Sequence, residues 1–407
     1  MRRLVGVVAL IAAMSLVAAA CSKSSTSSGG TGGAQPVKYD PNAPLEDSLN
    51  LVIWPLYAEK DVVKPFEQAM GGKCTVKTKD ANTSDEMVNL MKQPGVYDGV
   101  SASGDATLRL IASNLVSPVD VSTFPDYANV MPSLQAPAHN TVNGVHYGVP
   151  YEWGPNILMY NKSVVKPAPT SWDVVFDTQL NGQPNPYAGK TTMYDSAIYI
   201  ADAAMYLKTH DPSLGITDPY ELTQDQLDAS VNLLKQAYPM VSKPWNVWSD
   251  EVDAFESGDM VAGTAWPANQ NVLESDGKVQ VASTTPTEGV TGWADTWMMS
   301  STAAHPNCMM AWMNYTLSDQ VQADTAYTFG ATPSVTTACD TLKQKLIAGY
   351  GQAVGSAAYP LYHCADDAYL AKIYLWKTPV PNCGDSRGNT CTDYTTWQQD
   401  WIDVKGG

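Results

Sequence analysis

Along the first third of the chain, segments with the apolar pattern of strands alternate with segments that have the apolar spacing of helices. "SLNLVIW" (48–54) and "KCTVKTKDA" (73–81) have the apolar and β-branched content of strands. "KDVVKPFEQAM" (60–70) and "SDEMVNLMKQ" (84–93) have the spacing of amphipathic helices, and the second opens with Ser-Asp-Glu, a favourable helix start. The same order continues through residues 97–120. This succession predicts an α/β sheet with functional residues at the carboxyl ends of its strands.

A second α/β stretch begins near Lys162. It contains further helix and strand patterns at 195–210, 223–238 and 250–266. The chain of 407 residues is too long for one compact core and fits two or three domains. No internal repeat is evident. Two α/β units of this size usually leave a cleft between them, so we expect a binding cleft.

The N-terminus has the layout of an export signal. Two arginines precede an apolar run, which predicts a signal peptide over residues 1–20. "LVAAAC" resembles the lipobox of bacterial lipoproteins, although Ala18 stands where leucine is usual, and this implies lipidation of Cys21. A plain signal peptide is the alternative. Residues 21–45 are predicted to form a flexible, lipidated tether because their Ser/Gly-rich start cannot form a core.

The cysteine count indicates an oxidising compartment. Six cysteines remain after Cys21, and an even number in an exported chain favours three disulfides. The turn-rich "CGDSRGNTC" predicts a short loop closed by one disulfide, and the other two pairings are weaker guesses. The expected pairs are Cys383–Cys391, Cys308–Cys339 and, by subtraction, Cys74–Cys364. We expect no metal, because no CxxC pair and no histidine pair at ligand spacing is present.

Charge and motifs narrow the function. Acidic residues outnumber basic ones 41 to 24, for a net charge of −17, which argues against nucleic-acid binding. The acidity suits a cationic ligand, although alone it mostly promotes solubility. "NPYAGKTT" lacks the first glycine of a P-loop because position 184 is proline, and GxSxG, HExxH and GxGxxG are absent. We therefore expect no enzymatic activity and no cofactor.

"EGVTGWADTWMM" (288–299) places one carboxylate between two tryptophans. In a strand, Trp293, Asp295 and Trp297 point to the same face. A buried carboxylate without a partner is costly. Asp295 therefore needs a positive charge, either from an internal Lys or Arg or from a ligand.

Four segments carry a resemblance to a known family. They are "YGVPYEWGPNILMYNKSVV" (147–165), "PAPTSWDVVFD" (167–177), "AFESGDMVAGTAW" (254–266) and "PTEGVTGWADTWMM" (286–299). In this order they resemble extracellular solute-binding proteins of ABC importers, specifically the spermidine/putrescine group. The resemblance covers roughly residues 46–340.

The resemblance implies a periplasmic-binding-protein-like fold with two α/β lobes, a hinge of crossing strands and an interlobe cleft. Lobe 1 would comprise residues 46–152 and 294–340. Lobe 2 would comprise residues 160–290 and 345–407.

The resemblance also implies a ligand site. Its aspartates hold ammonium groups and its aromatic rings cover the methylene chain. Two family glutamates are replaced by Leu56 and Ile198, while Asp105 stands in place of a tyrosine, which favours a shorter or differently charged ligand than spermidine. Asp195 and Asp105 are alternatively helix caps, and Tyr151 and Trp153 are alternatively core. The expected ligand-binding residues are Trp54, Tyr57, Ser103, Asp105, Tyr151, Trp153, Asp195, Trp266, Trp293 and Asp295.

These features together predict a lipid-anchored, monomeric binding protein that delivers a small polyamine to an ABC permease. Its expected location is the outer face of the bacterial cytoplasmic membrane or the periplasm. An ω-amino acid such as γ-aminobutyrate remains an alternative ligand, but it needs a cation for its carboxylate. A sugar remains open because tryptophans also stack on pyranose rings, and an adhesion protein would use the aromatics structurally.

Overall fold

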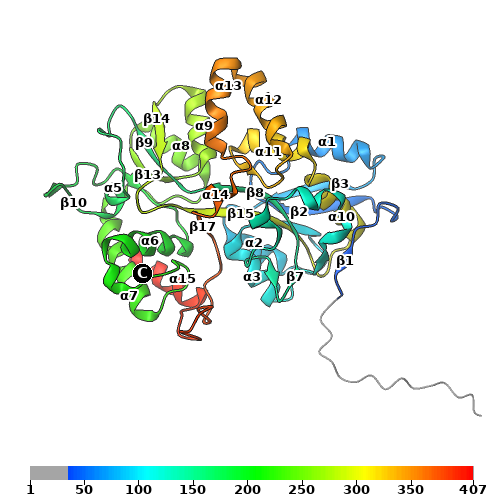
Figure 1. Cartoon of the computed structure of the whole chain (residues 1–407), viewed down its shortest axis with the longest axis horizontal. Coiled ribbons are helices and arrows are strands. Elements are labelled where there is room, and N and C mark those ends of the chain that lie inside the picture. Colours follow the sequence, from blue (N-terminus) through cyan, green and yellow to red (C-terminus); the bar gives the residue numbers. More distant parts are fainter. Residues whose placement is uncertain (1–34, 407) are drawn as a thin grey trace, which may run out of the picture. The chain divides into compact units, whose positions relative to one another are not determined.

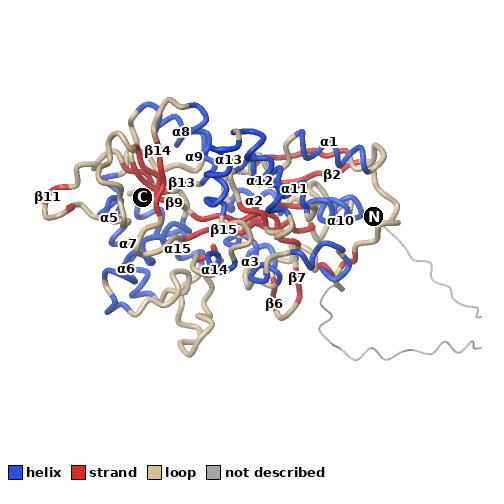
Figure 2. The backbone as a smooth tube through the Cα atoms, turned by 45° about the horizontal axis from the view of Figure 1, so that its top comes forward, coloured by secondary structure: helices blue, strands red, loops and turns tan. Residues whose placement is uncertain are grey.

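Two mixed β-sheets, each flanked by helices, organise the part of the chain that the computed structural model describes, residues 35–406 (Figure 1). The predicted signal peptide and Cys21 lie outside the described residues. Within 35–406, no helix combines the length and the apolar content that crossing a bilayer requires. Figure 2 shows β9, β13 and β14 grouped apart from β15 and β2.

The larger sheet has the strand order β16-β8-β15-β4-β2-β3, with β17 beside β15. Strand β2 runs parallel to β3 and β4, whereas β15 is antiparallel to both β4 and β8. The strands expected near 48–54 and 73–81 are present. The bounds are β2 (Ser48–Ile53), β3 (Thr75–Asp80), β4 (Gly99–Ala102), β8 (Val149–Pro155), β15 (Thr291–Met299), β16 (Thr332–Pro333) and β17 (Tyr374–Leu375).

Of the helices around this sheet, α1 and α2 begin where the sequence predicted. Thr83 caps α2 by accepting a hydrogen bond from the Glu86 backbone N–H, and acidic side chains fill the first turn. Figure 1 shows α1 and α11 above the sheet and α2 and α3 below it. The bounds are α1 (Lys60–Ala69), α2 (Ser84–Met91), α3 (Gly104–Ala112), α10 (Pro306–Thr316) and α11 (Asp319–Phe329).

The smaller sheet has the order β12-β13-β9-β14. Its strands are β9 (Ile157–Asn161), β12 (Thr191–Thr192), β13 (Ala262–Ala265) and β14 (Val281–Thr284). The C-terminal helix α15 packs against α7, so the end of the chain returns to this half (Figure 1). The helices are α5 (Asp173–Phe176), α6 (Ile200–His210), α7 (Gln224–Ala237), α8 (Trp248–Ser257), α9 (Pro267–Asp276) and α15 (Tyr394–Val404).

Two direct strand-to-strand connections cross between the sheets, and residues 376–393 form a further connection from β17 to α15. Strand β8 leads directly into β9, and β14 leads into β15. At the second crossing, Ser171 donates a hydrogen bond to the Glu288 carboxylate, and the Trp172 indole donates to the Gly289 carbonyl at 3.0 Å. Two of the four sequence segments that carry the resemblance therefore contact each other there.

The remaining elements connect and extend the two sheets. Helix α12 packs on α11 and α13. Residues 37–38, expected in the flexible tether, instead pair in parallel with Val119–Asp120 as β1 with β5. The bounds are β1 (Val37–Lys38), α4 (Pro132–Gln135), β5 (Val119–Asp120), β6 (Thr141–Val142), β7 (Val145–His146), β10 (Gln179–Leu180), β11 (Gln183–Pro184), α12 (Ala338–Tyr350), α13 (Gln352–Ala358) and α14 (Asp367–Leu370).

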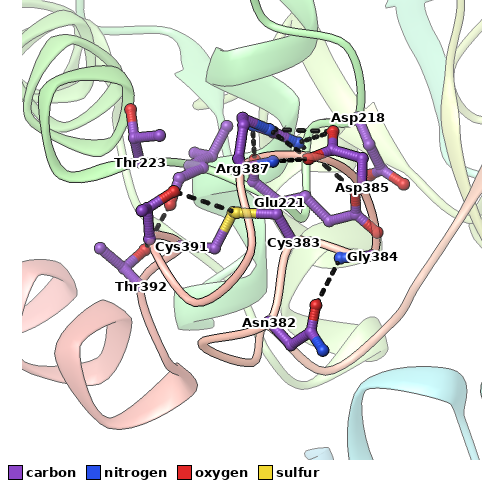
Figure 3. The surroundings of a disulfide bond; sticks show 12 residues. Asp218, Glu221, Thr223, Asn382, Cys383, Gly384, Asp385, Arg387, Cys391 and Thr392 are labelled. Carbon is purple, nitrogen blue, oxygen red and sulfur yellow. Dashed lines mark hydrogen bonds and ion pairs between the residues drawn. A yellow bond between two sulfur atoms is a disulfide. The ribbon is translucent and has the colours of Figure 1, made fainter.

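Three disulfides are formed, but only one follows the expected pairing. Cys383 bonds to Cys391 as predicted (Figure 3). The pairs Cys308–Cys339 and Cys74–Cys364 are wrong, because the structure joins Cys74 to Cys308 and Cys339 to Cys364.

Glu46 shows why the long-range pair forms. The Cys74 backbone N–H donates to the Glu46 carbonyl at 3.0 Å, and the Cys308 N–H donates to the Glu46 carboxylate at 2.8 Å. The start of β3 and the start of α10 thus meet at one residue. This proximity is tertiary and leaves no trace in cysteine spacing.

Candidate ligand-binding site

Seven side chains enclose a small cavity, which we call the Asp295 chamber. Its volume is about 10 Å³, roughly the space one water molecule needs. Five of the seven were expected from the sequence. The lining residues are Trp54, Ser103, Trp266, Trp293, Asp295, Phe329 and Trp376.

Strand ends supply three of these residues. Trp54 directly follows β2, Ser103 follows β4 and Trp266 follows β13. Ser103 and Trp266 are also the N-cap residues of α3 and α9. The carboxyl ends of strands in both sheets therefore meet at one cavity, as expected for an α/β protein. Asp295 and Trp293 come from the middle of β15.

Asp295 is buried and bound by two hydroxyl groups. Tyr57 donates a hydrogen bond to it at 2.5 Å, and Ser103 donates a second. No Lys or Arg of residues 35–406 forms an ion pair with it. Burial raises the pKa of Asp295 from 3.8 to about 7, against the lowering effect of the two hydroxyls. Within residues 35–406, therefore, no internal Lys or Arg supplies the positive charge that the sequence led us to expect at Asp295.

Glu152 is a second buried carboxylate that the sequence analysis missed. Both of its oxygens lack hydrogen-bond partners, and its side chain is fully buried. Pairing of β8 with β15 shifts at Asp295, so that Tyr151 and Glu152 together face that one residue as a β-bulge. Burial, and then the nearby Asp295 charge, raise the pKa of Glu152 well above its usual value. Glu152 stands in the apolar run "VPYEWG". A carboxylate within an apolar strand is the same signal that identified Asp295.

Aromatic rings continue outward from the chamber. The Trp266 ring lies edge-on to Trp54 at 5.9 Å and contacts Tyr194 at 5.4 Å. Tyr194 in turn stacks on Trp376 at 5.6 Å. Phe329 lies edge-on to Trp293 at 5.5 Å. Phe329 and Trp376 were not among the ligand-binding residues expected from the sequence.

Three expected residues lie behind the chamber or beside it. The Tyr151 hydroxyl bonds to Thr325 and its ring packs edge-on against Tyr57 at 5.3 Å. Trp153 is fully buried, 6.4 Å from the ring of Tyr369. These two, together with Tyr57, support the lining from outside it.

Asp105 is held by its own helix and its neighbour. Ser84 donates a hydrogen bond to it at 2.7 Å, and Arg109 lies 3.9 Å away. Burial raises its pKa to about 6. Asp105 is in the first turn of α3, whereas the N-cap position belongs to Ser103.

Asp195 has an internal cation. Its carboxylate accepts hydrogen bonds from the Lys405 ammonium at 2.9 Å and from the Trp401 indole at 2.8 Å. It does not line the Asp295 chamber. The sequence could not reveal this partner, because Lys405 lies 210 positions away at the end of the chain.

A larger hollow lies on the other side of the chamber wall. Its volume is about 580 Å³, and α9, β14, α12 and α13 line it. Pro267 and Gly330 belong to this hollow, while their neighbours Trp266 and Phe329 belong to the chamber. Gly330 packs so tightly on α9 that an added Cβ would lie 2.4 Å from the Asn271 side chain. Among residues 35–406 no cluster of three His, Cys, Asp or Glu is arranged to hold a metal ion.

Two sheets joined by crossing segments, with a cavity formed where their strands end, define a binding protein of the periplasmic type. The chain belongs to the bacterial extracellular solute-binding protein family, whose model matches residues 61–347. It is the substrate-binding protein of an ABC importer, and proteins of this family are transport proteins, not enzymes.

Relatives and solved structures agree with this membership. A putrescine-binding periplasmic protein of Escherichia coli strain K12 is 25% identical over 291 residues, 68% of this chain and 75% of its own. A spermidine/putrescine-binding periplasmic protein of the same strain is 23% identical, covering 70% and 76%. A putative spermidine/putrescine ABC transporter protein of Listeria monocytogenes has the same fold, with a TM-score of 0.70 over 89% of this chain and 99% of its own at 17% identity.

Proposed function

We propose that this protein captures a small alkylamine of the polyamine class, putrescine- or spermidine-like, and delivers it to an ABC permease. The observation that carries the proposal is Asp295, a buried carboxylate with two hydroxyl donors and no internal cation among residues 35–406. The polyamine-binding relatives support the same ligand class.

The physical argument is replacement of hydration. An alkyl ammonium that enters the chamber loses water, and the Asp295 carboxylate compensates with a charge-assisted hydrogen bond. Indole faces such as those of Trp293 and Trp266 add cation–π attraction of roughly 0.5–2 kcal/mol each and cover the methylene groups.

The chamber must open for this ligand to enter. A volume of about 10 Å³ holds no more than about one water molecule. We propose hinge motion at the two crossings, between lobe 1 (46–152 and 294–340) and lobe 2 (160–290 and 345–407). This division would separate Trp54, Ser103 and Asp295 from Trp266, and the relatives' fold supports it.

An ω-amino acid is a second candidate. The indole N–H groups of Trp54, Trp293 and Trp376 have no hydrogen-bond partner, so a ligand with an acceptor opposite its amine would satisfy some of them. Against it, no Lys or Arg is among the chamber's lining residues.

Calorimetric titration of residues 35–407 with putrescine, spermidine, γ-aminobutyrate and maltose tests the proposal. We expect one of the two polyamines to bind, and Asp295→Asn to abolish the binding heat. Asp195→Asn is the matched control: it should leave binding unchanged because Lys405 already occupies that carboxylate. Binding of maltose alone, or polyamine binding that survives Asp295→Asn, would overturn the proposal.

We further propose a monomer anchored through Cys21 at the outer face of the cytoplasmic membrane. The periplasmic and extracellular setting of the family supports export. Metabolic labelling with a fatty-acid probe, compared between the full chain and Cys21→Ala, tests the anchor.

A further inference from the structure

We propose that Trp376 limits the length of the ligand, because a C-terminal strap holds its indole at one side of the Asp295 chamber. We define the strap as residues 374–392. This inference rests on the proposed amine-binding function. Nothing in the sequence pattern pointed to Trp376, and it is the chamber residue furthest along the chain.

The strap begins on the central strand of the site. Strand β17 pairs with the start of β15, Tyr374 beside Thr291 and Leu375 beside Gly292. The Trp376 backbone N–H then donates to the Gly292 carbonyl at 2.7 Å. Trp376 is thereby tied to the strand that carries Trp293 and Asp295.

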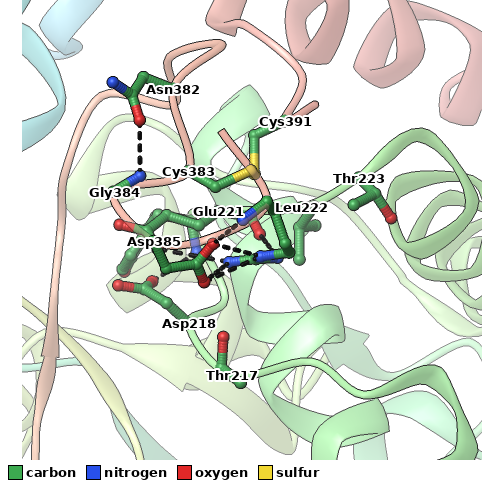
Figure 4. Close-up of polar contacts among 12 residues, drawn as sticks. Thr217, Asp218, Glu221, Leu222, Thr223, Asn382, Cys383, Gly384, Asp385 and Cys391 are labelled. Carbon is green, nitrogen blue, oxygen red and sulfur yellow. Dashed lines mark hydrogen bonds and ion pairs between the residues drawn. A yellow bond between two sulfur atoms is a disulfide. The ribbon is translucent and has the colours of Figure 1, made fainter. Parts of the chain in front are cut away.

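Ion pairs fix the strap immediately after Trp376. The Lys377 ammonium lies 2.9 Å from Asp218 and 2.6 Å from Glu221. Arg387, further along the strap, bonds to Asp385 and to the Glu221 carbonyl at 2.9 Å (Figure 3). Figure 4 shows Asp218, Glu221 and Asp385 close together beside this loop. Lys377 is about a quarter exposed, so its pairs are better shielded than ordinary surface ion pairs.

A disulfide closes the far end of the strap. Cys383–Cys391 forms a loop that lies against residues 218–223, and Thr392 donates its backbone N–H to the Leu222 carbonyl at 2.9 Å (Figure 3). The strap is therefore fastened to the segment between α6 and α7 at both Lys377 and Thr392.

The strap backbone at Trp376–Thr378 also lies directly against the start of α3. A Cβ added to Gly104 would lie 1.8 Å from the Trp376 carbonyl oxygen, so only glycine permits this approach. Thr378 donates its hydroxyl to the Asp105 carbonyl at 2.8 Å. Gly104 is adjacent to Ser103, which donates to Asp295. The backbone of Trp376 is thus fixed from the strap side and from the α3 side.

The indole itself takes up room beside the carboxylate. It is 2% exposed, lies nearly parallel to Tyr194 and lines the chamber. Trp376 is bonded to Gly292, which lies at the crossing between the two lobe ranges, so hinge opening alone leaves the ring beside β15. A long ligand extended from Asp295 towards Tyr194 therefore meets Trp376, whereas a short one does not.

Truncation of this side chain tests the inference. We expect Trp376→Ala to favour spermidine over putrescine by about tenfold relative to wild type, because the freed volume accepts the extra aminopropyl group. Trp245→Ala is the matched control, since Trp245 packs on Trp266 and Tyr194 in the same aromatic cluster but does not line the chamber. It should leave the ratio of the two dissociation constants unchanged.

The outcomes separate the two proposals. If wild type binds polyamines and the ratio is unchanged in Trp376→Ala, or shifts equally in Trp245→Ala, Trp376 does not set length and this inference is wrong. If wild type binds neither polyamine, the proposed function fails and this inference falls with it. Should Trp376→Ala fail to fold, Trp376→Leu and Trp376→Phe provide a graded series, in which the smaller side chain must give the larger shift.

Discussion

Asp295 is a single residue on which much of the behaviour of the site depends. It is buried, accepts two hydroxyl hydrogen bonds and has a pKa raised to about 7. An ammonium ligand needs the carboxylate form, so binding and deprotonation of Asp295 are linked. Measurements at pH 7 alone would miss this linkage.

We expect amine affinity to rise with pH up to about 7 and then level off. Below that pH each unit should weaken binding by about tenfold, because one proton must leave Asp295 first. Titration calorimetry from pH 5 to 8.5, in two buffers of different ionisation enthalpy, measures both the affinity and the proton released. A flat profile would show that Asp295 is already charged before the ligand arrives.

The same pKa predicts the stability of the ligand-free protein. A carboxylate with a raised folded-state pKa binds its proton more tightly when folded, so stability is lost as pH rises from about 4 to about 7. The shift corresponds to roughly 4 kcal/mol at most. At pH 8 Asp295→Asn should therefore be more stable than wild type by about 1–3 kcal/mol and should unfold at a higher urea concentration. The gain is smaller than about 4 kcal/mol because the amide oxygen replaces only one of the two carboxylate oxygens that accept hydroxyl hydrogen bonds. Equal stability at pH 8 would contradict the prediction.

Individual site residues were predictable where strand periodicity placed them. Trp293 and Asp295 share a face of β15, and both line the chamber. Asp195 was not predictable in the same way, because its partner is Lys405. Trp376 and Phe329 enter from distant segments, and no local pattern marks an aromatic residue as facing a cavity.

At the scale of elements, the strands and helices of the first half follow the sequence closely. The strand and helix patterns predicted β2, α1, β3, α2 and β4, although β2 and β4 are largely buried on both faces and β3 is mostly exposed at the sheet edge. The cysteine pairing did not follow the sequence prediction, apart from Cys383–Cys391. Pairing depends on which elements touch, such as β3 with α10, and spacing does not encode that.

The two kinds of disulfide should differ in what they contribute. Loop-closure entropy predicts about 5 kcal/mol for Cys74–Cys308, with a separation of 234, and about 2–3 kcal/mol for Cys383–Cys391, with a separation of 8. Chemical denaturation of the two double Cys→Ser variants measures the difference. A larger loss from the Cys383–Cys391 pair would mean that the strap stabilises the fold by more than loop closure.

At the scale of the whole molecule, the narrow chamber implies motion. A cavity of about 10 Å³ cannot admit a diamine, so the binding-competent form must be more open. We expect X-ray scattering of residues 35–407 to show a smaller radius of gyration with saturating polyamine than without it. An identical radius of gyration would mean that side chains such as Trp376, and not the lobes, move to admit the ligand.

Whole-molecule arrangement was also the least predictable level. The resemblance covered roughly residues 46–340 and assigned the tail, residues 345–407, only to lobe 2. Within that tail α15 packs on α7, and the strap reaches the chamber. Tail segments of this kind have strong local signals for turns and disulfides but none for their docking site.

Four of the chamber's seven lining side chains are indoles, out of twelve in the chain. A third of the tryptophans therefore border one cavity, and a charged guest there would alter their fluorescence emission. The protein thus carries its own optical reporter of occupancy, and ligands can be screened by fluorescence in a plate without any label.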